Sequence, residues 1–165
     1  MARTLTVADA IPLLEVHPRR IAAATAGIAS QRLRNERMLG EWTANDVLAH
    51  LRCCADVCID VVPRILAEPR PRLRVIGPRD LIEQTGYRDL EFAGSLRAFA
   101  RQRSRLVAML RKLPRADWAR GAYIGERGRW RERTVQEYAD WLARHEERHV
   151  EHFERFGRVQ ARKSR

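Results

Sequence analysis

The sequence predicts an all-α fold, a four-helix bundle, and three observations support this prediction. Its 165 residues suit one domain spanning residues 1–165, and its 45% hydrophobic and 32% charged residues are usual for a globular protein. Four segments repeat apolar residues every three or four positions, which is the period of an amphipathic helix. Little of the remaining sequence alternates with the two-residue period of a strand. Four long helices with little strand pattern indicate a bundle.

The first helix is expected at residues 7–29. Apolar residues from Ile11 to Ile28 follow the helical period along this segment. Pro18 lies near the middle, and because proline lacks an N–H group we expect it to kink the helix or divide it in two.

The second helix is expected at residues 43–67. Thr43 is followed three positions later by Asp46, a pattern close to the capping box that begins many helices. Trp42 precedes this cap and is expected to pack near Val47 as a hydrophobic staple. Both residues are therefore predicted to be structural.

The third helix is expected at residues 90–113, where Pro114 ends it. The stretches 69–88 and 114–133 contain glycines and prolines typical of turns, so they are expected to be irregular. Within the second stretch, residues 122–124 (Ala-Tyr-Ile) form a candidate short strand. We expect both stretches to lie over the ends or sides of the bundle, where loops shape pockets.

The fourth helix is expected at residues 134–156. Thr134 and Glu137 form a full capping-box pattern at its start. Gly157 is a candidate C-terminal stop, and the residues from about 158 onward are expected to form a basic, frayed tail.

Histidines interrupt the apolar stripes of the second and fourth helices. His145 and His149 fill a gap in the fourth stripe, and histidines four apart on a helix project side by side at a spacing that suits one shared metal ion. His50 lies on the apolar side of the second helix. A buried imidazole needs a hydrogen-bond partner or a metal, so these three are candidate ligands of one divalent ion in the bundle core. The alternative is a partly exposed polar face.

Other residues near this pattern have weaker assignments. The letters HEERH match the HExxH pattern of metalloproteases, in which Glu146 would be the general base. Only 16 residues follow His149, so the third ligand is more plausibly upstream. Glu146 remains a candidate catalytic residue that orients or deprotonates a water, or else a solvated helix residue. His152 lies near the metal ligands or on the helix surface, and His17, beside Pro18, is expected to lie away from the other histidines.

The basic residues permit an anionic partner without requiring one. The net charge is +11, and 30 of the 32 basic residues are arginine. Arg97, Arg101 and Arg105 form an i, i+4 row, but no recognition motif accompanies it, so a nucleic-acid partner is not favoured. Arg103 interrupts the apolar stripe of the third helix. It is a candidate to bind a carboxylate in the pocket, with a surface arginine whose stem packs on the core as the alternative.

The composition argues against several classes of protein, namely membrane-spanning, secreted, disulfide-rich and zinc-knuckle proteins. No stretch approaches the ~18 apolar residues of a membrane span, and the N-terminus lacks the pattern of a signal peptide, so a cytoplasmic location is expected. The three cysteines lie within residues 53–58, a spacing that suits neither a disulfide framework nor a zinc knuckle.

With these residues in view, the sequence resembles the DinB/YfiT-like superfamily of metal-binding four-helix bundles. The segment GEWTANDVLAHL, residues 40–51, resembles the turn and histidine at the start of that family's second helix. The later HxxxH pair follows in the family's order, and VHPRRIAAATAG upstream resembles its first helix. Where members often carry glutamine three residues after the last ligand, this chain has His152.

The resemblance implies a fold, a site and a function. It implies helices in up-down-down-up order, a homodimer, and the ligands His50, His145 and His149 around zinc or nickel with open positions. It implies a metal-dependent enzyme acting on a small molecule, such as a transferase or isomerase that uses a low-molecular-weight thiol. A metal-dependent hydrolase using a metal-bound water, or a binding protein without catalysis, is the alternative.

Overall fold

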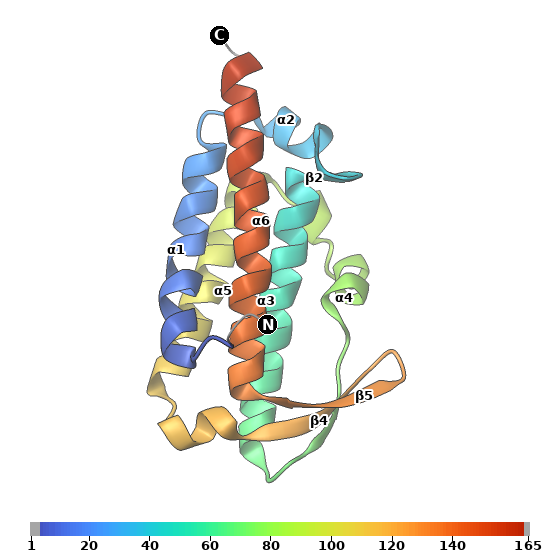
Figure 1. Cartoon of the computed structure of the whole chain (residues 1–165). Coiled ribbons are helices and arrows are strands. Elements are labelled where there is room, and N and C mark those ends of the chain that lie inside the picture. The colour runs from blue at the N-terminus through green and yellow to red at the C-terminus, as the bar shows by residue number, and fades with distance from the viewer. Residues whose placement is uncertain (1–3, 164–165) are drawn as a thin grey trace.

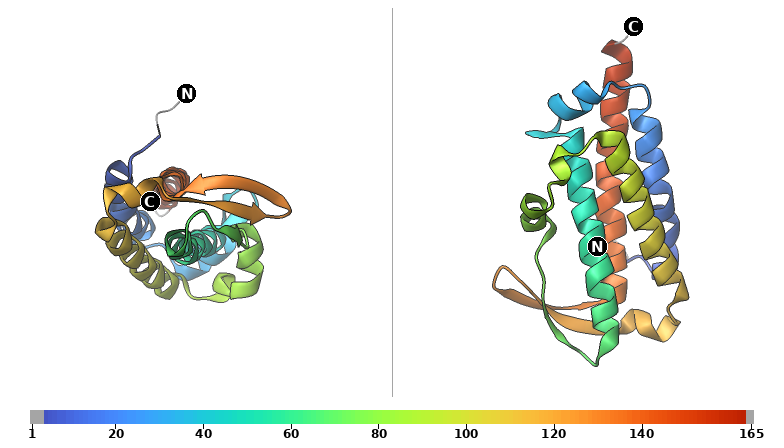
Figure 2. Two further views of the ribbon diagram at one scale, coloured as in Figure 1. Left: turned by 90° about the horizontal axis from the view of Figure 1, so that it is seen from below. Right: turned by 180° about the vertical axis from the view of Figure 1, so that it is seen from behind.

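Four long helices form the body of the protein, as the helical periodicity predicts. The computed structural model describes residues 4–163, and its long helices are α1 (Val7–Thr25), α3 (Ala44–Ala67), α5 (Phe92–Lys112) and α6 (Val135–Lys163). They pack side by side as a bundle, with α1 and α6 running upward and α3 and α5 running downward in Figure 1. The view along the bundle in Figure 2 shows the four helices around one shared interior.

Shorter helices connect the long ones. The α-helices α2 (Ser30–Asn35) and α4 (Pro78–Thr85) and the 3-10 helices η1 (Tyr87–Asp89) and η2 (Arg115–Ala119) lie in the connections. The segment that contains α4 runs back along the side of the bundle, so that α3 and α5 begin at the same end (Figure 1). No helix in residues 4–163 is long and apolar enough to cross a membrane.

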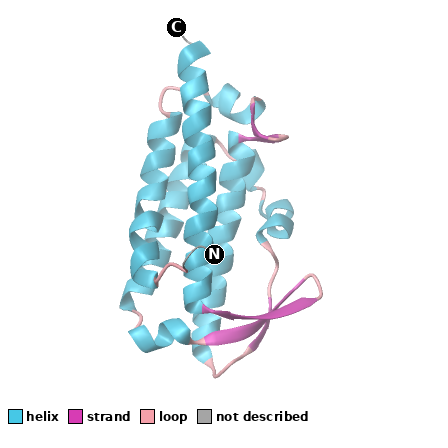
Figure 3. Cartoon of the chain, in the orientation of Figure 1, coloured by secondary structure: helices cyan, strands magenta, loops and turns pink. Residues whose placement is uncertain are grey.

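The prediction of a strictly all-α fold is wrong, because residues 4–163 contain five short strands as well as the helices. Figure 3 shows where these strands lie. One pair joins β1 (Arg37–Leu39) to β2 (Trp42–Thr43). A second sheet has the order β3-β4-β5 and lies at the end of the bundle where α6 begins.

The strands of this second sheet fall in the two stretches expected to be irregular. Strand β4 (Gly121–Glu126) contains the short strand expected at residues 122–124, which is confirmed. It pairs antiparallel with β5 (Arg129–Thr134) and parallel with β3 (Arg72–Arg74). Strand β5 was not predicted, because four of the six residues in its sequence, RWRERT, are charged and apolar residues do not alternate along it.

Capping boxes begin the helices that carry the candidate site. The Thr43 side chain accepts a hydrogen bond from the Asp46 N–H at 3.2 Å, and the Thr43 N–H donates to the Asp46 carboxylate at 2.9 Å. Thr134 and Glu137 make the same reciprocal pair before α6, at 3.1 and 2.7 Å. Both predicted caps are confirmed, and they fix where the site-bearing helices start.

The first and last helices end at different points from those expected. Helix α1 runs through Pro18 without division and ends at Thr25, so Pro18 does not separate it into two helices. Helix α6 does not stop at Gly157 but continues to Lys163, and residues 158–163 are helical rather than a frayed tail. Residues 164–165 of the expected tail lie outside the described part of the chain.

Gly157 serves the packing of α1 against α6 rather than a helix end. A Cβ atom at this position would lie 2.2 Å from the carbonyl oxygen of Ala24, so only glycine allows the two backbones to approach so closely. The extra turns of α6 then find partners beside α2. Arg32 donates to the Gln160 amide oxygen at 2.8 Å, and Lys163 pairs with Glu36 at 2.9 Å.

The bundle core consists of two main apolar clusters along its length. One contains Cys54 and Ala143 and extends to the second sheet, and the other contains Leu51 and Val150 at the opposite end. On α6, His145 and His149 lie between Ala143 and Val150, and on α3 His50 directly precedes Leu51 and lies one turn before Cys54. The three histidines therefore lie where the two clusters adjoin.

Candidate metal centre

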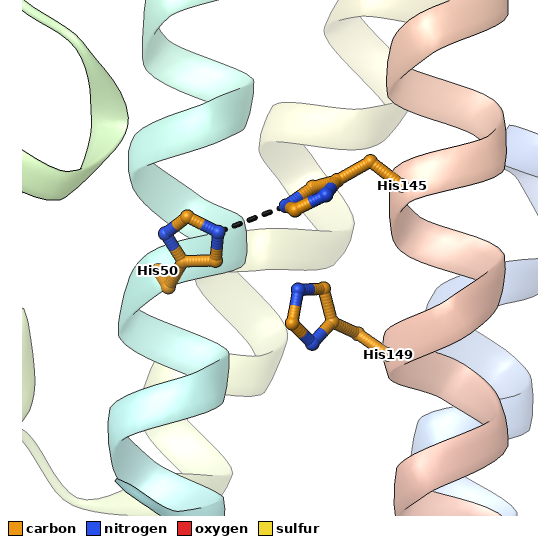
Figure 4. A group of neighbouring side chains, drawn as sticks. All are labelled: His50, His145 and His149. Carbon is orange, nitrogen blue, oxygen red and sulfur yellow. Dashed lines mark hydrogen bonds between the residues drawn. The ribbon is translucent and has the colours of Figure 1, made fainter. Parts of the chain in front are cut away.

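Three histidines from α3 and α6 converge inside the bundle. Figure 4 shows His50 facing His145 and His149 across the gap between the two helices. The Nε2 atoms of His50 and His145 are 2.8 Å apart, and one nitrogen from each ring lies within 4.8 Å of the others. The convergence predicted from the helical stripes is therefore confirmed, and the i, i+4 pair does supply two of the three rings from one helix.

The arrangement fits a divalent metal ion. The 2.8 Å between the two Nε2 atoms is shorter than twice a zinc–nitrogen bond of ~2.0–2.1 Å, so both atoms can reach one ion. The Nδ1 atoms of His50 and His149 are buried without a hydrogen-bond partner in residues 4–163. An ion held through Nε2 would leave these Nδ1 atoms as N–H groups, so the fit to a metal rests on how close the ring nitrogens lie to one another.

Burial also keeps the three rings neutral, which is the form that binds metals. Loss of solvation lowers the pKa of His50 and His145 to about 4 and that of His149 to about 3. At neutral pH each ring therefore retains a nitrogen lone pair that is free to bind a cation.

Aromatic rings hold two of the histidines in place. Trp42 meets His50 edge-on at 5.3 Å between ring centroids, and Trp141 stacks on His145 at 5.4 Å. Trp42 also packs against the apolar cluster that contains Val47, as predicted, but its contact with His50 went unforeseen. The Cys54 sulfur lies 3.7 Å from His50 Nε2, and burial raises the pKa of this thiol well above its usual range.

His152 lies next to the group without joining it. Its ring is 5.9 Å from that of His149, and the side chain is partly exposed. This position is compatible with the predicted place near the metal ligands, and its role stays a prediction.

Glu146 does not face the histidines, as a catalytic base at the metal would, and it does not lie in solvent, so it occupies neither of the two predicted positions. It points toward α1 and α5, where its carboxylate accepts hydrogen bonds from Arg103 and from His17 Nδ1, the latter at 2.9 Å. The side chains of Glu146 and Arg103 are 0% and 2% exposed. The HExxH pattern is thus split across two faces of α6, and the carboxylate is not available as a base at the centre.

Arg103 likewise is not on the wall of the cavity beside the histidines and is not a surface residue. It is buried in the core because Glu146 supplies an internal counter-charge. His17 belongs to the same network, since its Nε2 atom lies 2.8 Å from the Glu147 carboxylate. It is apart from the other histidines, as expected, but it is a core residue with two acidic partners.

Comparison with known proteins places this bundle in a family. A model of the DinB superfamily matches residues 13–153. The chain belongs to the DinB superfamily. The structure of YfiT from Bacillus subtilis, described as a probable metal-dependent hydrolase with an unusual four-helix bundle topology, matches with a TM-score of 0.77 and 22% sequence identity. The match covers 98% of this chain and 93% of YfiT. Among curated proteins, none matches the sequence.

A cavity adjoins the three histidines of this DinB domain. Its volume is about 220 Å³, and His50, His145 and Trp141 form part of its wall. Most of the rest of the wall comes from the sheet and from the segment that leads into α4 with its first turn, which agrees with the expectation that the irregular stretches shape a pocket. Val57 of α3 and Tyr138 of α6 complete it. Its charged lining residues are Arg79, Glu126, Arg127, Arg131 and Arg133. Sequence reasoning missed these arginines because nothing in their spacing separates them from the many others.

Proposed function

We propose that this DinB protein is a metal-dependent enzyme in which His50, His145 and His149 hold one divalent ion, zinc or nickel. The observation that carries this proposal is the convergence of three neutral imidazoles, two buried and one half-buried, beside a cavity. Nitrogens of three imidazoles within 4.8 Å of one another offer a zinc-like ion three of the ligands that it prefers.

A divalent ion bound by three neutral imidazoles keeps its full charge and open positions, and so supplies Lewis-acid polarisation and lowers the pKa of a bound water or thiol. The chain's own residues have separate tasks. Trp42 and Trp141 hold the rings of His50 and His145 in position. The cavity admits a small molecule to the same two rings, and the apolar clusters around them limit the access of water.

Two reaction classes suit this site. Hydrolysis is supported by Glu126, a carboxylate on the cavity wall that is a candidate proton acceptor in place of Glu146. YfiT, which shares the fold, is described as a probable metal-dependent hydrolase. A transferase or isomerase that uses a low-molecular-weight thiol is supported by a different observation. Among residues 4–163 the three histidines have no carboxylate grouped with them, and a thiol activated by a cation needs no such base.

Metal titration of the purified protein tests the shared proposal. We expect one zinc ion per chain in the wild type, measured by competition with a chromophoric chelator. His50→Ala and His149→Ala should each weaken zinc binding strongly, whereas His17→Ala should keep the stoichiometry, since His17 lies outside the group. Equal loss in all three variants, or no stoichiometric binding by the wild type, would overturn the proposal.

Turnover assays then separate the two reaction classes. A panel of ester and amide substrates is compared with and without added thiol, using zinc-loaded and nickel-loaded protein. Conversion that requires the thiol identifies the transferase or isomerase class, and conversion in its absence identifies the hydrolase class.

A further inference from the structure

The cavity beside the metal centre is lined by an excess of positive charge. Four arginines line it, namely Arg79, Arg127, Arg131 and Arg133, and Glu126 is the one carboxylate on its wall among the described residues. The arginines come from two separate parts of the chain, the start of α4 and the β4–β5 hairpin. Their convergence is a property of the fold rather than of a local charged run.

Strand register explains why two of them face the cavity. In the β4–β5 pair, Ile124 lies opposite Arg131 and Ala122 lies opposite Arg133. Residues that lie opposite each other share a face of the sheet, and residues two apart on a strand do so as well. Ala122 and Ile124 are buried against the bundle, so Arg131 and Arg133 are also directed to this inner face.

Half of this positive charge has no carboxylate partner among residues 4–163. Arg127 is paired with Asp80, and Arg131 lies 3.7 Å from Glu126. Arg79 makes no ion pair with any residue in the described range 4–163. Arg133 has no carboxylate within pairing distance in that range either, and its contacts are with aromatic rings.

The two unpaired arginines lie close to the metal centre. Arg133 is within 5.9 Å of the Trp141 ring, which stacks on His145. Arg79 lines the same cavity as His50 and His145. Burial lowers the pKa of Arg133, and the nearby charge of Arg131 lowers it further. Positive charges left together in a cleft attract an anion.

We propose that this cavity is an anion-binding subsite that holds a doubly charged group of the substrate, a dicarboxylate or a phosphate monoester, through Arg79 and Arg133 beside the three histidines. With Arg127 and Arg131 offset by Asp80 and Glu126, these two arginines leave two positive charges to be balanced. The cavity of about 220 Å³ is smaller than the ~300–1,000 Å³ of typical drug-sized sites, which selects a small molecule. The proposal deepens the proposed function and rests on it for the presence of a substrate.

The subsite can be tested by calorimetric titration of metal-free and zinc-loaded protein with three probes. Succinate represents the dicarboxylate, methyl phosphate represents the phosphate monoester, and succinamide is the neutral control. We expect saturable binding of at least one anion and none of succinamide. Whichever anion binds identifies the source of the charged group.

Single-residue variants tie that binding to the cavity. Arg79→Gln and Arg133→Gln should each raise the Kd by about tenfold or more, the scale of a lost charge-assisted contact. Arg79 is exposed and unpaired, so its replacement should not impair folding. Arg129→Gln is the matched control, because Arg129 is on the same strand and face but outside the cavity. Its Kd should stay within twofold of the wild type.

Failure of this inference differs from failure of the proposed function. If the wild type binds neither anion in either metal state, or if Arg129→Gln weakens binding as much as Arg79→Gln, the subsite is wrong even where zinc binds. If zinc does not bind, the proposed function fails, and the metal-free titrations still decide whether the arginines form an anion site.

Discussion

Replacing Glu146 with glutamine is expected to destabilise the protein strongly, although this residue is remote from the cavity. The change removes the negative charge beside Arg103, whose side chain is 2% exposed. Burial lowers the pKa of Arg103 to about 10, so the guanidinium stays charged at neutral pH and loses its counter-charge. Breaking a buried pair from one side costs ~3–5 kcal/mol. For a chain of this size that loss corresponds to a fall of ~6–20 °C in Tm.

Urea and thermal denaturation of metal-free protein in a chelating buffer measure this effect without a contribution from bound metal. Glu151→Gln is the matched control, because Glu151 is an exposed residue on the same helix, and it should change stability by less than ~0.5 kcal/mol. The double variant Arg103→Met/Glu146→Leu removes both charges and should recover much of the loss. A change below ~1 kcal/mol in Glu146→Gln, with turnover abolished, would refute the structural role and restore Glu146 as a candidate base.

Three further predictions address the helix start, the packing of α1 on α6, and acidity. Thr43→Ala should cost about 1 kcal/mol in urea denaturation while zinc stoichiometry is retained, and the reverse pattern would contradict the division of roles. Gly157→Ala should destabilise the protein by ~1–3 kcal/mol, because the added Cβ would meet the Ala24 carbonyl. Gly94→Ala is the control and should be neutral or stabilising, because the nearest atom to its added Cβ is 3.8 Å away. Equal effects of the two variants would contradict the close packing of α1 on α6. The Tm of metal-free protein should fall as the pH is lowered from 6.5 to about 4, because the three converging histidines bind protons in the unfolded chain but not in the folded protein over this range. A Tm that does not change over this range would contradict their burial.

The long helices were predictable because each repeats apolar residues at the helical period, and α3 and α6 also have a local start signal. Thr43 with Asp46 and Thr134 with Glu137 satisfy backbone groups within one turn, so their effect depends on few distant residues. The end of α6 was not predictable in this way. Gly157 resembles a stop signal, and only the proximity of the Ala24 backbone shows that it is a packing residue.

The convergence of the three histidines was predictable from periodicity, but the charged core residues were not. Three histidines at apolar positions indicate that something polar lies inside the bundle. Arg103 also occupies an apolar position, yet its partner Glu146 is 43 residues away on another helix, and no local pattern pairs them. The positions of the cavity arginines could not be predicted either, because it is the pairing of β4 with β5 that directs Arg131 and Arg133 inward.

The most direct test of the account is the position of a metal ion in a crystal of zinc-loaded protein, located by anomalous scattering at the zinc edge. We expect one strong anomalous peak per chain among the rings of His50, His145 and His149, with zinc–nitrogen distances of ~2.0–2.1 Å. In His50→Ala crystals grown under the same conditions the peak should be lost or much weaker. A peak located elsewhere, or no peak at a zinc concentration that saturates the protein in solution, would contradict the central claim.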